Sequence, residues 1–104
     1  MTQRRRKQRK RYGRPPLPKN INLKLKADYF KPQGTPMRSL EVVELKQEEV
    51  EALRLKNIED KDQIQCAETM NVSQSTFQRI LNSAYTKISQ ALVKGKAIKI
   101  QNKT

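Results

Sequence analysis

Apolar residues recur at every third or fourth position between residues 77 and 92, and this feature constrains the fold more than any other. Such spacing is that of one face of an α-helix. Ser73 stands before the repeat, where its hydroxyl can cap a first turn, and Gly95 follows it as a stop. The pattern predicts a helix over 73–94 that buries one stripe: Phe77, Ile80, Leu81, Ala84, Ile88, Ala91 and Leu92.

A shorter helical pattern lies directly before this one, over residues 61–70. Asp60 or Asp62 stands where a side chain can cap its first turn. We expect the helix to turn three residues toward the core: Ile64, Ala67 and Cys66.

The residues that join these two helices favour a helix-turn-helix, the motif whose second helix enters the DNA major groove. Ala67 is small where the helices must cross closely. Asn71 tolerates the left-handed backbone of the turn better than most residues other than glycine. Val72 supplies an apolar plug, and Ser73 then caps the second helix. Because several independent positions agree, the pattern favours this motif over a bare helical pair.

The outer face of helix 73–94, opposite the apolar stripe, carries hydrogen-bonding side chains and no acid. Arginine suits guanine, and glutamine or asparagine suits adenine. The alternative is that these side chains are merely compatible with solvent, although an ordinary solvated face would mix Glu with Lys. The face consists of Ser75, Arg79, Asn82 and Thr86, flanked by Gln74 and Gln78.

The remaining segments give weaker patterns. Residues 47–58 are rich in helix formers, and eight of the ten acids fall in 41–62, where a solvated face is expected. Residues 21–26 and 96–100 alternate apolar and basic side chains, which predicts two short strands that pair with each other. Residues 29–36, with two prolines and a glycine, predict an irregular loop.

The formal charge of +13 is concentrated at the N-terminus, where residues 1–26 hold eleven Lys or Arg and no acid. Residues 1–20 are expected to be a disordered basic arm that binds phosphate, and residues 21–104 the domain. Within the arm, YGRPP resembles the Gly-Arg-Pro core of minor-groove hooks, so Arg11 and Arg14 are candidate DNA contacts. RNA would accept such an arm equally well.

Several classes of function are excluded by composition. The chain has one cysteine and no histidine, so an intrachain disulfide, a Cys/His zinc site and imidazole catalysis cannot form. No glycine-rich phosphate loop is present. We expect no enzyme, metal or cofactor. No apolar run reaches the ~18 residues of a membrane span, and the N-terminus lacks the apolar part of a secretory signal. The expected location is therefore cytoplasmic, at the nucleoid.

Four segments, YFKP, EALRL, NVSQSTFQRIL and ALVKGKAIKI, resemble an uncharacterised family of small bacterial and archaeal proteins predicted to bind DNA. The family's helix-turn-helix is similar to region 4 of sigma-70 initiation factors, and the resemblance covers about residues 14–100. It implies a trihelical fold and motif roles for Ser73, Thr76, Phe77, Arg79, Ile80 and Leu81. The chain departs from the family at Asn71, usually Gly, at Gln74, often basic, and at Gln78, usually small. The last two departures alter the presumed reading surface.

These observations predict an all-α, trihelical helix-turn-helix domain with a basic arm and short flanking strands. Its expected function is sequence-specific binding of double-stranded DNA, as a transcriptional regulator. A homodimer would give so small a motif two half-sites. The alternatives are an RNA-binding or ribosome-associated protein, and a module that docks on polymerase or another factor through residues 41–62. The candidate DNA contacts of the helix are Ser73, Gln74, Ser75, Thr76, Gln78, Arg79 and Asn82.

Overall fold

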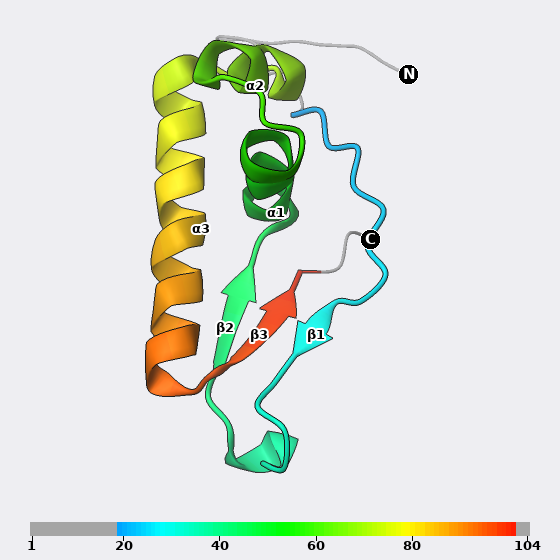
Figure 1. Cartoon of the computed structure of the whole chain (residues 1–104), viewed down its shortest axis with the longest axis vertical. Coiled ribbons are helices and arrows are strands. Elements are labelled where there is room, and N and C mark those ends of the chain that lie inside the picture. The colour runs from blue at the N-terminus through cyan, green and yellow to red at the C-terminus, as the bar shows by residue number, and fades with distance from the viewer. Residues whose placement is uncertain (1–18, 102–104) are drawn as a thin grey trace, which may run out of the picture.

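The computed structural model describes residues 19–101, which form three helices and a three-stranded sheet. Figure 1 shows α2 and the sheet at opposite ends of the long axis, with α3 running from one to the other. A 3-10 turn at Met37–Ser39 precedes the second strand, and a π-helical turn at Arg54–Ile58 continues α1. The order of elements is β1 (Tyr29–Phe30), β2 (Val42–Leu45), α1 (Gln47–Leu53), α2 (Gln63–Met70), α3 (Gln74–Lys94) and β3 (Ala97–Ile100).

Four residues set the ends of α2 and α3 by local chemistry. The side chains of Asp62 and Ser73 each accept a hydrogen bond from the backbone N–H three residues on, at 2.8 and 3.1 Å, and so cap the two helices. Asn71 ends α2 with φ 62° and ψ 46°, and Gly95 ends α3 with φ 66°. The predicted caps at Ser73 and Gly95, and the left-handed conformation at Asn71, are confirmed.

The three helices share one apolar core. Cys66 and Ala67 are buried, as predicted, but Ile64 is 52% and Leu92 75% exposed, so those two predictions are wrong. Leu92 lies two residues before the end of α3, at the margin of the apolar stripe. The core cluster consists of Ala52, Leu55, Cys66, Ala67, Met70, Phe77, Ile80 and Leu81.

A mixed sheet in the order β1-β3-β2 contradicts the expected all-α fold. β3 pairs antiparallel with β1 and parallel with β2. In β2, Val43 and Leu45 are buried while Val42 and Glu44 are exposed, which is the alternation of a strand with one covered face. Sequence analysis did not predict β2, because the alternation spans only four residues beside an acidic helix. The hydrogen-bond partners of β2 come from β3, which is distant in sequence.

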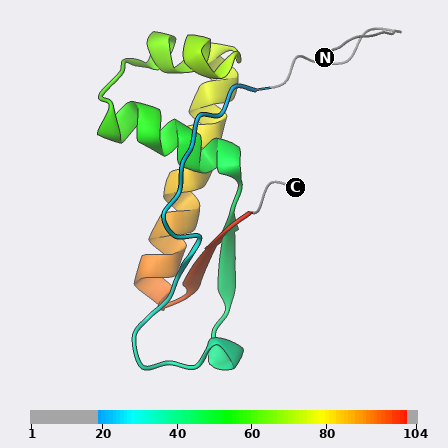
Figure 2. The same ribbon diagram turned by 90° about the vertical axis from the view of Figure 1, so that its right-hand side faces the viewer.

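Residues 21–26 do not form the predicted strand, and they do not pair with β3. Both edges of β3 are already occupied, one by β1 and the other by β2. Residues 29–36 are also not wholly irregular, because they contain β1. Figure 2 shows residues 21–26 running past the helices from the end that carries α2 down to the sheet.

The expected disorder of the arm concerns residues that lie almost wholly outside the described part, so it stays a prediction, as does the boundary at residue 21. No helix within residues 19–101 is long and apolar enough to cross a membrane.

Candidate nucleic-acid interface

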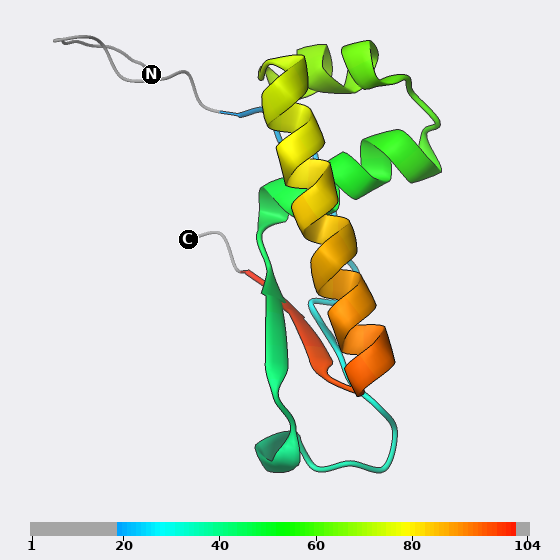
Figure 3. The ribbon, with the colours of Figure 1, turned by 90° about the vertical axis from the view of Figure 1, so that its left-hand side faces the viewer.

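The outer side of α3 presents polar side chains over its first three turns. Gln74, Ser75, Arg79 and Asn82 are exposed, and Gln78 is half-buried. In Figure 3, α3 lies in front of the other described elements. No acidic residue follows Glu68, so α3 itself carries only neutral and positive groups.

Ser73 and Thr76 serve mainly to build the start of α3. The Ser73 hydroxyl caps the helix and donates to Thr76 Oγ1 at 2.9 Å, and its oxygen lies 3.2 Å from Ser75 Oγ. Thr76 Oγ1 in turn accepts from Arg79 Nη2 at 3.2 Å. The Thr76 hydroxyl thus fixes the orientation of the Arg79 guanidinium, which lies about one turn from the start of the helix. Most of the five N–H donors of Arg79 remain available to bind a ligand.

Gln78 and Asn82 form a second small unit one turn further along. Gln78 Nε2 donates to Asn82 Oδ1 at 2.9 Å. The pair still offers the Gln78 carbonyl oxygen as an acceptor and the Asn82 amide as a donor. An acceptor beside a donor is the pattern that matches the major-groove edge of adenine.

Glu49, on α1, holds α3 in place from behind, and this residue was expected on a solvated face. It is only 3% exposed. Its carboxylate accepts from Ser83 Oγ at 2.5 Å and Lys87 Nζ at 2.9 Å, both on α3, and from Lys46 N at 2.8 Å. Burial raises the pKa of Glu49, but these hydrogen bonds and the Lys87 charge outweigh it and leave that pKa below its ordinary value.

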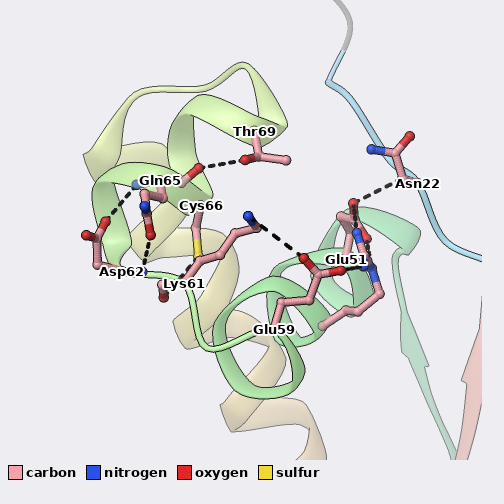
Figure 4. A network of polar contacts seen from close by, with 9 residues as sticks. Asn22, Glu51, Glu59, Lys61, Asp62, Gln65, Cys66 and Thr69 are labelled. Atoms are coloured by element: carbon pink, nitrogen blue, oxygen red, sulfur yellow. Dashed lines mark hydrogen bonds and ion pairs between the residues drawn. The ribbon is translucent and has the colours of Figure 1, made fainter.

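Glu51 is the second carboxylate that was wrongly expected in solvent, and it is fully buried. Arg54 donates to both of its oxygens, at 2.7 and 3.0 Å, and the backbone N–H of Asn22 donates at 3.0 Å. Arg54 also pairs with Glu59, and these carboxylates raise the pKa of the guanidinium further above its already high value. Figure 4 shows Asn22 reaching Glu51 from the N-terminal segment.

The residues before Asn22 are also held against the helices. Asn20 N donates to Met70 O, on the last residue of α2, at 3.1 Å, and Lys19 lies 3.3 Å from Glu48. The predicted arm contacts Arg11 and Arg14 lie outside the described residues, so the structure does not place them.

Sequence reasoning missed these supporting groups for two reasons. Asn20 and Asn22 act through backbone N–H groups, which leave no side-chain signature. The burial of Glu49 could have been inferred from the sequence. Ser83 and Lys87 stand four residues apart at the margin of the apolar stripe, where a polar pair indicates a polar partner on a neighbouring element.

No group of three or more Cys, Asp or Glu in residues 19–101 is placed to hold a metal ion. Cys66 is buried, and burial raises the pKa of its thiol, which makes it a poor nucleophile.

Comparison with known proteins gives a family without an assigned activity. Residues 6–103 match the family described as "Protein of unknown function DUF134". A UPF0251 protein of Desulforudis audaxviator is 51% identical over 89 residues, which cover 86% of this chain and 58% of the relative. One of Thermoanaerobacter pseudethanolicus is 48% identical over 88 residues, covering 85% and 75%.

A third UPF0251 protein, from Clostridium botulinum, is 55% identical over 73 residues, which cover 70% of this chain and 46% of the relative. The chain spans less than three fifths of the length of the relatives from Desulforudis audaxviator and Moorella thermoacetica. No solved structure matches the chain.

Proposed function

We propose that this chain, which belongs to the DUF134 family of unknown function, binds double-stranded DNA at specific sequences and regulates transcription. The observation that carries the proposal is the exposed, acid-free outer side of the first half of α3. There Arg79 and the Gln78–Asn82 pair, supported by Gln74 and Ser75, offer the donors and acceptors that base edges require.

The way α2 leads into α3 supports a helix-turn-helix role. Only residues 71–73 separate the two helices, and Asn71 makes the turn in the left-handed conformation. Ala67, 2% exposed, lies in the core that α2 shares with α3. In such a motif the second helix enters the major groove with its N-terminal residues at the bases. The start of α3 lies at the end of the molecule remote from the sheet, where the sheet would not obstruct a duplex (Figure 1).

The structure reduces the support for a docking module that acts through residues 41–62. Six of the eight acids there form an ion pair, are buried or cap a helix within the described residues. Glu41, Glu48 and Glu59 pair with Lys96, Lys19 and Arg54, Glu49 and Glu51 are buried, and Asp62 caps α2. An RNA-binding protein remains the alternative that the experiment must separate.

The test is selection of bound sequences from a random duplex pool, run in parallel with an RNA pool. We expect an enriched duplex motif, which is lost or relaxed at one position in Arg79→Ala. Ser89→Ala is the matched control, because Ser89 is an exposed residue further along the same helix. A palindromic motif would indicate a homodimer with two half-sites. Preference for RNA, or no enriched duplex, would overturn the proposal.

A further inference from the structure

The amides of Gln78 and Asn82 have unequal parts in the hydrogen bond that joins them. The two residues stand four apart on α3, and Gln78 Nε2 donates to Asn82 Oδ1 at 2.9 Å. A side-chain amide carries one carbonyl oxygen and two N–H groups. Gln78 therefore keeps its carbonyl oxygen and a second N–H for a ligand, on one amide whose orientation Asn82 fixes.

An amide held in this way matches adenine better than any other base. In the major groove adenine presents N7 as an acceptor and its N6 amino group as a donor, so the oxygen and the N–H of one amide bind both. Guanine presents two acceptors there, and cytosine presents a donor only. Neither of these bases uses both groups of the amide.

The place of Gln78 on α3 suits a contact with a base. It is the fifth residue of α3, and the second helix of a helix-turn-helix contacts bases with its N-terminal residues. The Gln78 side chain is half-buried and bonded at its amide. It therefore loses less conformational freedom on binding than a free glutamine would.

We propose that Gln78 reads an adenine with its own amide and that Asn82 is its positioning residue. This inference rests on the proposed function and adds one base to it. The Gln78 oxygen accepts from adenine N6, its free N–H donates to N7, and its other N–H stays on Asn82. A pair of this spacing also stabilises a helix slightly without any ligand. The test therefore records which base is preferred rather than the stability of the protein.

The first experiment follows the base that the full chain selects from a random duplex pool. Gln78→Glu keeps the shape of the side chain but offers acceptors only, and the Asn82 amide can turn to donate to it. Because a carboxylate accepts from cytosine N4, one position of the motif should change from adenine to cytosine. Gln90→Glu is the matched control, since it adds the same charge at an exposed position of the same helix, and it should select the parent sequence.

The second experiment separates the role of Asn82 from that of Gln78. Asn82→Asp keeps the acceptor for Gln78 but removes the N–H donors of Asn82, whereas Asn82→Leu removes the acceptor as well. The measured quantity is the preference for adenine over guanine on two duplexes that differ at this base pair alone. A ratio within one variant cancels the uniform loss of affinity caused by an added negative charge. The parent should prefer adenine by roughly 5- to 150-fold. Asn82→Asp should keep that preference, and Asn82→Leu should lose most of it.

A modified duplex tests the same contact on the parent protein. An adenine analogue with carbon in place of N7 is placed at each selected adenine in turn. At one position it should weaken binding by the parent severalfold and have little effect on Gln78→Ala.

Three results would overturn the proposal. The Gln78→Glu chain selects the parent sequence, Asn82→Asp loses the preference for adenine, or the analogue leaves the affinity of the parent unchanged at every position. The last result decides the matter even if the variants fail to fold. Failure of the proposed function looks different, because no duplex would then be selected in the first place.

Discussion

Replacement of Lys87 by methionine should loosen α3 from α1 by a predictable amount. Lys87 Nζ donates to Glu49 Oε1 at 2.9 Å and to the carbonyl oxygen of Glu44 at 3.0 Å. Methionine keeps an unbranched side chain and removes only the charge and the donors. A hydrogen bond to a charged group contributes roughly 1.5–3 kcal/mol and a neutral one roughly 0.5–1.5 kcal/mol.

The net loss should be smaller than the sum of these two values. The Lys87 side chain is 28% exposed, so water replaces part of what the variant loses. Glu49 also keeps its hydrogen bonds from Ser83 and Lys46. We expect a loss of about 2 kcal/mol in the free energy of unfolding, which lowers Tm by about 8–16 °C in a domain of this size.

The dependence on pH identifies the source of that loss. The pKa of folded Glu49 lies below its ordinary value, so the pair stabilises the fold fully above the ordinary carboxyl pKa of ~4.3. The stabilisation disappears as the pH falls through the lower, folded pKa. The difference in Tm between the parent and Lys87→Met should therefore be large at neutral pH and shrink in acid.

Thermal unfolding by circular dichroism at several pH values measures this difference. Lys94→Met is the matched control, because Lys94 is an exposed lysine on the last turn of the same helix. A double-mutant cycle with Glu49→Gln should give a coupling of about 1–2 kcal/mol. The reasoning fails if Lys87→Met behaves like Lys94→Met, or if its effect is the same at all pH values.

Three further predictions address the fold and the proposed DNA contacts. Arg79→Ala should leave Tm nearly unchanged, because Arg79 is exposed. It should weaken specific DNA binding by roughly 1–3 kcal/mol in a titration, with Ser89→Ala as the control. Ala67→Leu should lower stability in urea unfolding by roughly 1–3 kcal/mol, because Ala67 is 2% exposed in the core that α2 shares with α3. Deletion of residues 1–18 should make the slope of log K against log salt less negative by about 3–6. The selected DNA sequence should stay unchanged, since phosphate contacts position a protein on DNA without specifying the base sequence. An unchanged slope would mean that the arm does not bind DNA.

The ends of α2 and α3 could be predicted because each depends on one local residue. The features act within a few residues of the helix ends that they determine. They are the hydroxyl of Ser73, the left-handed backbone of Asn71 and Gly95, and the apolar repeat between residues 77 and 92. The exposure of Arg79 followed from the same repeat, because the apolar stripe defines the opposite side of the helix. Contact of these residues with DNA stays a prediction.

The sheet and the buried carboxylates could not be predicted in this way, because both depend on pairs of residues that are far apart in sequence. Val43 becomes a strand residue only when Ile98 pairs with it. Glu49 and Glu51 lie in a stretch whose composition is that of a solvated helix, and they are buried only because α3 and residues 19–22 cover α1 from different sides.

The positions of these two carboxylates suggest what α1 contributes to the proposed function. A buried ion pair is often no more stable than apolar residues of the same volume, so stability alone does not explain two acids in this interior. An apolar contact, however, has little directionality, whereas a carboxylate fixes the donors that bind it. Glu49 fixes Ser83 and Lys87 on α3, and Glu51 fixes the N–H of Asn22. Because Glu49 and Glu51 are two residues apart on one short helix, they hold α3 and the segment around Asn22 against the same element. If α3 reads bases, this support keeps its side chains in one orientation toward the duplex.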